Sequence, residues 1–238
     1  QVAIMQEQDQ VVVLGLTPFA EHDHLLSFFG AHYGLGRLLL KRLPKGLGLQ
    51  PGQVVQLHWQ RRLPHQLGQG RVLEISHHFH QALLPGPSVL LPHYLLGLCQ
   101  PFLAEGDGHS QVFSALQRLL QTPPSWEQLA QFEQFFLAEI GFGLTLSGPA
   151  VQAAPGEPLY YVSPKTGVAA SARVGAPYAD RLLRLPAALG GEGGGGAEAY
   201  QLLTHFLTLA QVDLGQRPSL PGRDTLWQAL LRPEAEKA

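Results

Sequence analysis

The sequence predicts an α+β protein of two domains, in which a small β-barrel precedes a mainly helical region with a small β-hairpin insertion. Two observations carry this prediction. Residues 1–80 contain five short β-branched or leucine-rich runs separated by glycine and proline, whereas residues 88–231 contain segments with helical periodicity. Glycine and proline together (27 plus 19 of 238 residues) favour short elements joined by many turns.

The first five runs predict strands at 10–16, 25–29, 34–42, 53–61 and 70–76. Gly30 ends the second of them, and Gly34 with Gly36 fits a bent or bulged third strand, as the corner of a small barrel requires. Five strands in about 75 residues predict the five-stranded oligonucleotide/oligosaccharide-binding (OB) barrel, with an SH3-like barrel as the alternative. We therefore expect an OB-fold, nucleic-acid-binding domain at residues 1–80.

Residues 81–238 form the predicted helical domain. Apolar periodicity indicates helices at 88–103, 109–121, 126–140 and 197–210, with a weaker segment at 226–231. Ser125 followed by Gln128 matches a capping box at the start of the third helix. Because the apolar face of that helix includes Phe132 and Phe136, we expect it to form the centre of this domain.

Two irregular segments lie between the predicted helices. Residues 159–162 and 167–171 flank a Ser-Pro-Lys-Thr turn and predict a small β-hairpin. The glycine-rich run at 190–196 predicts a flexible loop by composition.

Composition excludes several classes of protein. The single cysteine, Cys99, cannot form an internal disulfide or a cysteine-based zinc site, and its leucine-rich surroundings predict a buried thiol. No apolar run reaches the ~18 residues of a membrane span. The chain contains no G-x-S-x-G, P-loop or H-E-x-x-H motif, and its histidine pairs lack partners at metal-ligand spacing. We therefore expect a cytoplasmic protein that is not an enzyme and has no catalytic residue, no metal, no cofactor and no membrane contact.

The formal net charge of −2 hides an asymmetry along the chain. Every charged side chain between Asp23 and Glu74 is basic, and eight of the eleven histidines lie in the first 80 residues. Such a local positive field is typical of a surface for a polyanion, although a solvated basic face is the alternative. The candidate DNA-binding residues are the seven cations of this window: Arg37, Lys41, Arg42, Lys45, Arg61, Arg62 and Arg71.

Aromatic residues near these cations could stack on bases, as in barrels that hold single strands. The local aromatics are Phe29, Tyr33 and Trp59, of which Trp59 is more simply explained as a core residue.

Three motifs, in this order and spacing, resemble the RecO family of bacterial recombination mediators, and in particular its alphaproteobacterial branch. They are L-Q-P-G-Q at 49–53, E-I-G-F-G-L at 139–144, and Y-V-S-P-K-T-G at 161–167 followed by G-A-P-Y-A-D-R-L-L-R-L-P at 175–186. The resemblance covers nearly the whole chain, weakly in the barrel and strongly from Phe132 to Pro186.

The resemblance implies an N-terminal OB barrel and a helical C-terminal domain that together bind single- and double-stranded DNA and anneal complementary strands. It also implies cooperation with RecR to load RecA onto DNA coated by single-strand-binding protein (SSB), contact with the SSB C-terminal tail, and a place at the bacterial nucleoid. Many members carry a four-cysteine zinc module, but residues 144–149 hold no cysteine, so the metal is not carried over. The alternative function is a protein-interaction scaffold whose basic barrel docks acidic protein tails.

Overall fold

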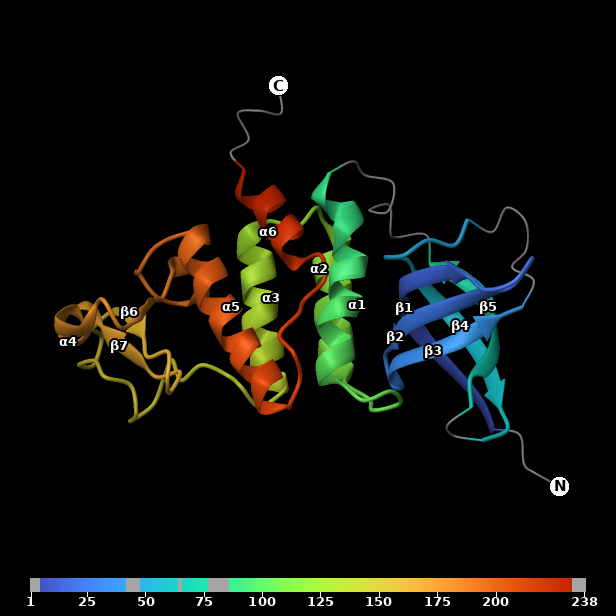
Figure 1. The fold of residues 1–238 in the computed structure, drawn as a ribbon, viewed down its shortest axis with the longest axis horizontal. Coiled ribbons are helices and arrows are strands. Elements are labelled where there is room, and N and C mark those ends of the chain that lie inside the picture. The colour runs from blue at the N-terminus through green and yellow to red at the C-terminus, as the bar shows by residue number, and fades with distance from the viewer. Residues whose placement is uncertain (1–4, 42–47, 64–65, 77–85, 233–238) are drawn as a thin grey trace. The chain divides into compact units, whose positions relative to one another are not determined.

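The computed structural model describes residues 5–41, 48–63, 66–76 and 86–232 (Figure 1). A closed barrel is followed by helices and a second, small sheet, which confirms the predicted α+β class. The chain forms two compact units, Gln1–Pro124 with Leu220–Leu226, and Ser125–Ser219 with Trp227–Ala238. The predicted domain boundary at residue 80 falls in 77–85, outside the described residues, so it stays a prediction.

The barrel contains the five predicted strands: β1 (Met5–Pro18), β2 (His24–Gly30), β3 (Gly34–Leu40), β4 (Val54–Arg61) and β5 (Gly68–Ser76). Their order around the barrel is β1-β2-β3-β5-β4, and only the β3–β5 pair is parallel. This topology is that of the OB barrel, which replaces the SH3-like alternative. β1 is longer than predicted because one part of it pairs with β2 and the other with β4, which closes the barrel.

Alternate residues of the strands point inward and form the barrel core. Its buried members are Val11, Val13, Leu26, Phe28, Leu38, Leu40, Leu49, Val55, Leu57 and Trp59. Trp59 is 3% exposed and Phe29 is fully buried, so neither presents a ring face to a base. Of the three aromatic residues considered for stacking, Tyr33 is the one that is partly exposed.

Two helices complete the first unit. The 3-10 turn η2 (Pro87–Leu90) leads into α1 (Leu91–Phe102), which packs against β1, and α2 (Ser110–Gln121) packs against β1 and β2. The predicted apolar face of α2 is buried. Burial raises the pKa of the Cys99 thiol in α1 to about 12, so this thiol stays protonated and unreactive at neutral pH.

The second unit is built on α3 (Trp126–Glu139) and α5 (Gly196–Asp213), which pack against each other. The capping box is confirmed, since the Gln128 backbone N–H donates to Ser125 Oγ and the Ser125 backbone N–H donates to Gln128 Oε1. Phe132 and Phe136 are buried, as predicted for the central helix. Glu133 is buried on the same helix, where it accepts a hydrogen bond of 2.9 Å from Trp227 Nε1.

The predicted hairpin is confirmed as β6 (Leu159–Val162) and β7 (Ala169–Ser171). A two-residue strand, β8 (Leu183–Arg184), adds a third strand that the sequence pattern did not predict. The remaining short elements are α4 (Ala172–Gly175), η3 (Ala176–Tyr178), η4 (Ala187–Leu189) and α6 (Arg223–Leu231). Within the described parts of the chain, no helix has the length and apolar character that a membrane crossing requires.

Candidate nucleic-acid interface

The structure separates the predicted DNA-binding cations into two groups. Arg37 and Arg61 each donate a hydrogen bond to a carboxylate. Lys41, Arg62 and Arg71 are exposed, and no carboxylate of the described residues lies within ion-pair distance of them. The other two predicted residues, Arg42 and Lys45, lie outside the described residues.

Arg61, at the end of β4, has the same inward orientation as Trp59. Its Nη2 donates to Glu7 Oε1 at 2.6 Å, its Nη1 donates to Tyr33 Oη at 2.7 Å, and the side chain is 16% exposed. Burial disfavours the guanidinium charge, but the hydrogen bonds to Glu7 and Tyr33 outweigh that desolvation and raise the pKa of Arg61 above its ordinary value. The half-buried Arg61 therefore joins β1, β4 and the last residue of the β2–β3 turn.

Tyr33 is held in place by a buried carboxylate on the opposite strand. Asp9 is 4% exposed and accepts backbone hydrogen bonds from His32 at 2.8 Å and Tyr33 at 2.9 Å. It also accepts from the backbone N–H of Gln10 and contacts His32 Nδ1, so its oxygens are well satisfied. The β2–β3 turn is thereby fixed against β1, with the Tyr33 ring 5.2 Å from the Trp59 ring.

Arg37 lies on the outer side of β3, where its Nε donates to Glu105 Oε1 at 2.6 Å. Glu105 belongs to the segment between α1 and α2. That segment approaches β3 closely because Gly34, with φ of 76°, has no side chain that would overlap the Asp107 carbonyl, and because the Gly106 N–H donates to the Leu35 carbonyl at 2.9 Å. The Arg37 charge is therefore partly neutralised by a carboxylate of the same chain.

The outer face of β1, β4 and β5 carries amide side chains in register. Gln8 pairs with His58, which pairs with Arg71; Gln6, Gln60 and Gln69 form the neighbouring row; and Gln10 pairs with Gln56, which pairs with Glu74, the one carboxylate in these three rows. Paired residues of adjacent strands share a face of the sheet. We call this surface the glutamine face and define it by Gln6, Gln8, Gln10, Gln56, His58, Gln60, Gln69 and Arg71.

Lys41 lies at the border of the glutamine face. Leu40 pairs with Gly70 in the parallel β3–β5 ladder, and Lys41 and Arg71 are the residues that follow this pair. Lysine and arginine neutralise phosphates, and glutamine donates to phosphate and sugar oxygens. This arrangement can hold a nucleic-acid backbone without reading its sequence.

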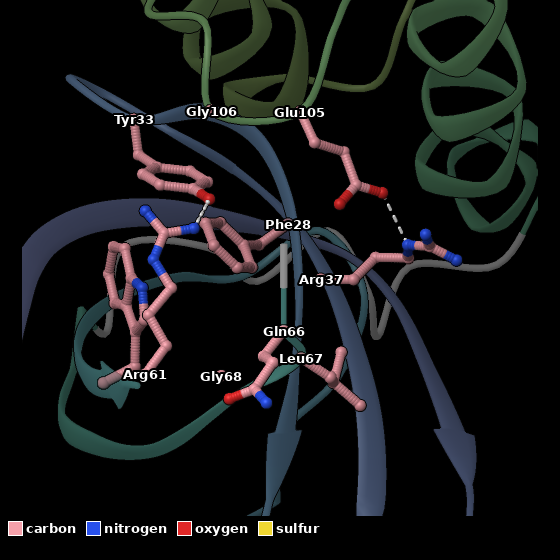
Figure 2. A pocket seen from close by; sticks show the side chains of 10 residues that line it. Phe28, Tyr33, Arg37, Arg61, Gln66, Leu67, Gly68, Glu105 and Gly106 are labelled. Carbon is pink, nitrogen blue, oxygen red and sulfur yellow. Dashed lines mark hydrogen bonds and ion pairs between the residues drawn. The ribbon is translucent and has the colours of Figure 1, made fainter. Parts of the chain in front are cut away.

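A pocket of about 470 Å³ opens beside Arg37 at the barrel (Figure 2). Phe28, Tyr33 and Trp59 line it with their rings, and Arg61, Arg37 and Glu105 supply charged groups. Gln66, Leu67, Gly68 and Gly106 complete the lining.

The described residues offer no alternative metal centre. They contain no group of three or more histidine, cysteine, aspartate or glutamate side chains placed to hold a metal ion. The one cysteine of the chain is buried in α1, so the residues present do not fit a four-cysteine zinc module.

Sequence reasoning missed two parts of this surface. The glutamines of β1 occur at every second position, and those of β4 lie four positions apart, so a period-two pattern of amides could have revealed the face. The carboxylates of Glu7 and Glu105 had no such signal, because each meets its arginine through the fold alone.

Comparison with known proteins identifies the family. A scan against models of protein families found no match. The chain is 34% identical to the DNA repair protein RecO of Rhizobium etli over 85% of this chain and 81% of that protein. It is 35% identical to RecO of Paracoccus denitrificans (93% and 95%) and 32% identical to RecO of Agrobacterium fabrum (98% and 96%). These relatives confirm the resemblance seen in the motifs: the chain belongs to the RecO family of DNA repair proteins.

Proposed function

We propose that this protein binds single- and double-stranded DNA through Lys41, Arg62, Arg71 and the glutamine face, and that it anneals complementary strands. The observation that carries this proposal is a set of exposed cations with no carboxylate of the described residues within ion-pair distance, beside rows of amides on an OB barrel of a RecO-family chain. Arg42 and Lys45 extend the same basic segment of sequence and are part of the proposed site.

Strand annealing follows from charge neutralisation. Two single strands repel each other through their phosphates, and bound lysine and arginine side chains reduce that repulsion. Contacts to phosphate and sugar leave the base edges free, so base pairing can drive the two strands together. No covalent step is needed, in agreement with the absence of a catalytic motif in the sequence.

The partners that we propose rest on family membership. Relatives that match most of the chain carry the name DNA repair protein RecO. We propose that this chain cooperates with RecR, contacts the C-terminal tail of SSB, and helps to load RecA onto SSB-coated single strands at the nucleoid in the bacterial cytoplasm.

The second candidate is a scaffold whose barrel docks an acidic protein tail. The same exposed cations favour it, because carboxylates and phosphates both seek lysine and arginine. Competition between an acidic peptide and an oligonucleotide distinguishes the two functions. A scaffold surface would bind the peptide more tightly, so that the peptide displaces DNA. A DNA-binding surface would bind the oligonucleotide more tightly, because its charge is denser.

The test is the binding of labelled oligonucleotides at several salt concentrations. We expect log K to fall with log salt by about 0.7 per phosphate contact for single strands. The triple variant Lys41→Ala, Arg62→Ala, Arg71→Ala should bind at least about tenfold more weakly and lose about 2 from the magnitude of the slope. A matched control, Arg118→Ala, Lys165→Ala, Arg217→Ala, removes the same charge from exposed positions outside the barrel and should change neither quantity.

We expect the strand-annealing rate of the triple variant to be lower than that of the parent, and the rate of the matched control to equal that of the parent. If the triple variant binds and anneals like the parent, the proposed surface is wrong. If the parent binds an acidic peptide more tightly than an oligonucleotide of equal charge, the scaffold is the better description.

A further inference from the structure

The pocket beside Arg37 has the size of a ligand site but an unusual balance of charge. Its volume of about 470 Å³ lies within the ~300–1,000 Å³ range of pockets that bind small molecules. Two of the lining residues are arginines, yet Arg37 is 2.6 Å from Glu105 and Arg61 is 2.6 Å from Glu7. A phosphate entering here would compete with a carboxylate for each guanidinium. The pocket therefore favours an uncharged ligand.

The remaining surfaces of the pocket suit a planar, aromatic ligand. Tyr33 is the partly exposed ring of the lining, and it packs on Phe28 and Trp59, which are 1% and 3% exposed and lie beneath it with centroids 5.2–5.8 Å apart. In Figure 2, Gln66 and Leu67 lie across the pocket from Glu105, while Tyr33 and Arg61 line one side.

The rim combines polar and apolar groups that are open to solvent. The Gln66 amide can both donate and accept, as the edge of any nucleobase can. Leu67 is 47% exposed, which leaves an apolar wall for the face of a ring. The Gln66 side chain and the Leu67 wall lie on consecutive residues of the segment that enters β5.

Both strands that border the pocket lead from it to the exposed cations. Arg37 and Gly68 line the pocket on the parallel strands β3 and β5, where Leu38 pairs with Gly68. Arg71 follows on β5, and Lys41 is the residue directly after the end of β3, in the same direction. At ~3.3 Å per residue, Arg71 lies about 10 Å along β5 from Gly68, the length of about three stacked nucleotides.

We propose that this pocket takes one unstacked nucleobase of a single DNA strand whose phosphates lie along Lys41 and Arg71. The inference rests on the proposed DNA binding and adds a base-dependent component to it. Because Arg37 and Arg61 are already paired with Glu105 and Glu7, the pocket competes poorly for phosphate against Lys41 and Arg71, so the base enters the pocket and the backbone stays outside. The site distinguishes a base from no base, and its rim sets any preference among bases.

The experiment compares three oligonucleotides of about twelve nucleotides, within the ~4–16-nucleotide site size of OB folds. One carries thymine throughout, one is abasic throughout, and one is abasic except for a single thymine; all carry the same phosphates. We expect the single thymine to restore most of the difference between the other two, which should be about tenfold in Kd.

The variant Gln66→Ala, Leu67→Ala removes the amide and the apolar wall from an exposed rim. It should bind the abasic strand as the parent does and reduce the preference for thymine to less than about threefold. Leu73→Ala is the matched control, since Leu73 is 46% exposed against 47% for Leu67 but does not line the pocket. It should keep the parent's preference, and melting temperatures should confirm that both variants are folded.

Each outcome separates the two proposals. If none of the three oligonucleotides binds, the proposed function fails. If all three bind with equal affinity, DNA binding stands and the base pocket is wrong. A preference for thymine that survives in the Gln66→Ala, Leu67→Ala variant places the base elsewhere and also overturns the inference. Displacement of the strand by micromolar free thymidine would indicate a small-molecule site instead.

Discussion

On and beside the glutamine face, Arg71 and Lys41 are exposed, with no ion-pair partner among the described residues. In the neighbouring pocket, Arg37 and Arg61 each lie 2.6 Å from a carboxylate oxygen. The two regions contain the same residue types, taken from the same basic stretch of sequence. The electric field at a surface therefore depends on where the fold places carboxylates beside the cations. A count of cations along the chain overstates the positive field at Arg37 and Arg61.

Arg61 and Arg62 give the sharpest form of this comparison, because they are adjacent in sequence. Replacing Arg61 with alanine leaves Glu7 partly buried without its main partner and removes the hydrogen bond to Tyr33. Loss of one partner of a fully buried pair costs about 3–5 kcal/mol. Because Arg61 and Glu7 are 16% and 27% exposed, we expect Arg61→Ala to lower the free energy of unfolding by ~2–3 kcal/mol.

Arg62→Ala is the control and should change the free energy of unfolding by less than ~0.5 kcal/mol, because its side chain is exposed. Urea unfolding measures both variants, and hydrogen exchange of the β1 and β4 amides reports on the barrel specifically. Equal losses of unfolding free energy in the two variants would contradict the difference that we infer between the ion-paired Arg61 and the exposed Arg62.

The second prediction compares an exposed cation with a carboxylate-bound one in DNA binding. Arg71→Ala should weaken binding of a single-stranded oligonucleotide about three- to fivefold and reduce the magnitude of the salt slope by about 0.7. Arg37→Ala should weaken it by less than about twofold, because a phosphate at Arg37 must compete with the Glu105 carboxylate. Fluorescence anisotropy at several salt concentrations measures both. A larger loss of affinity for Arg37→Ala than for Arg71→Ala would show that the ion pair with Glu105 does not limit DNA binding by Arg37.

The barrel and the central helix could be predicted from the sequence because their signals are local. β-branched or leucine-rich runs between glycines and prolines predicted five strands, and the Ser125–Gln128 capping box marked the first turn of α3. Elements with short or unusual signals were missed. β8 has two residues, too few for any periodicity, and the closing half of β1 is defined by its pairing with β4.

Composition also misled in one loop. The glycine run at 190–196 predicts a flexible segment, yet the Gly193 N–H donates to the Leu185 carbonyl at 2.6 Å, and a side chain at Gly191 would overlap the same carbonyl. These glycines permit close backbone contact, which composition cannot distinguish from freedom of motion.

The sequence names the candidate cations, which stay a prediction, but it does not reveal their carboxylate partners. All five described cations were named from sequence, but Glu7 is 54 residues from Arg61 and Glu105 is 68 residues from Arg37. Such pairs depend on barrel closure and on the approach of the α1–α2 segment. They are long-range products of the fold, and no local pattern marks them.

The smallest expected effect tests whether removing the carboxylate partner of Arg37 makes this exposed arginine available to a phosphate. Glu105→Gln keeps the shape of the side chain and a hydrogen-bond acceptor for Arg37 but removes the charge that competes with phosphate. We expect the affinity for a single-stranded oligonucleotide to rise about two- to threefold and the salt slope to steepen by about 0.7, as one phosphate contact is gained. Asp107→Asn is the control, because it removes the same charge from the same segment while its carboxylate lies 3.5 Å from His109 and not at Arg37. Because no ion pair joins Asp107 to Arg37, the control should change the affinity by less than about 1.5-fold. Equal gains in the two variants would mean that net charge alone governs binding, and the distinction between the pocket and the glutamine face would then have no functional consequence at Arg37.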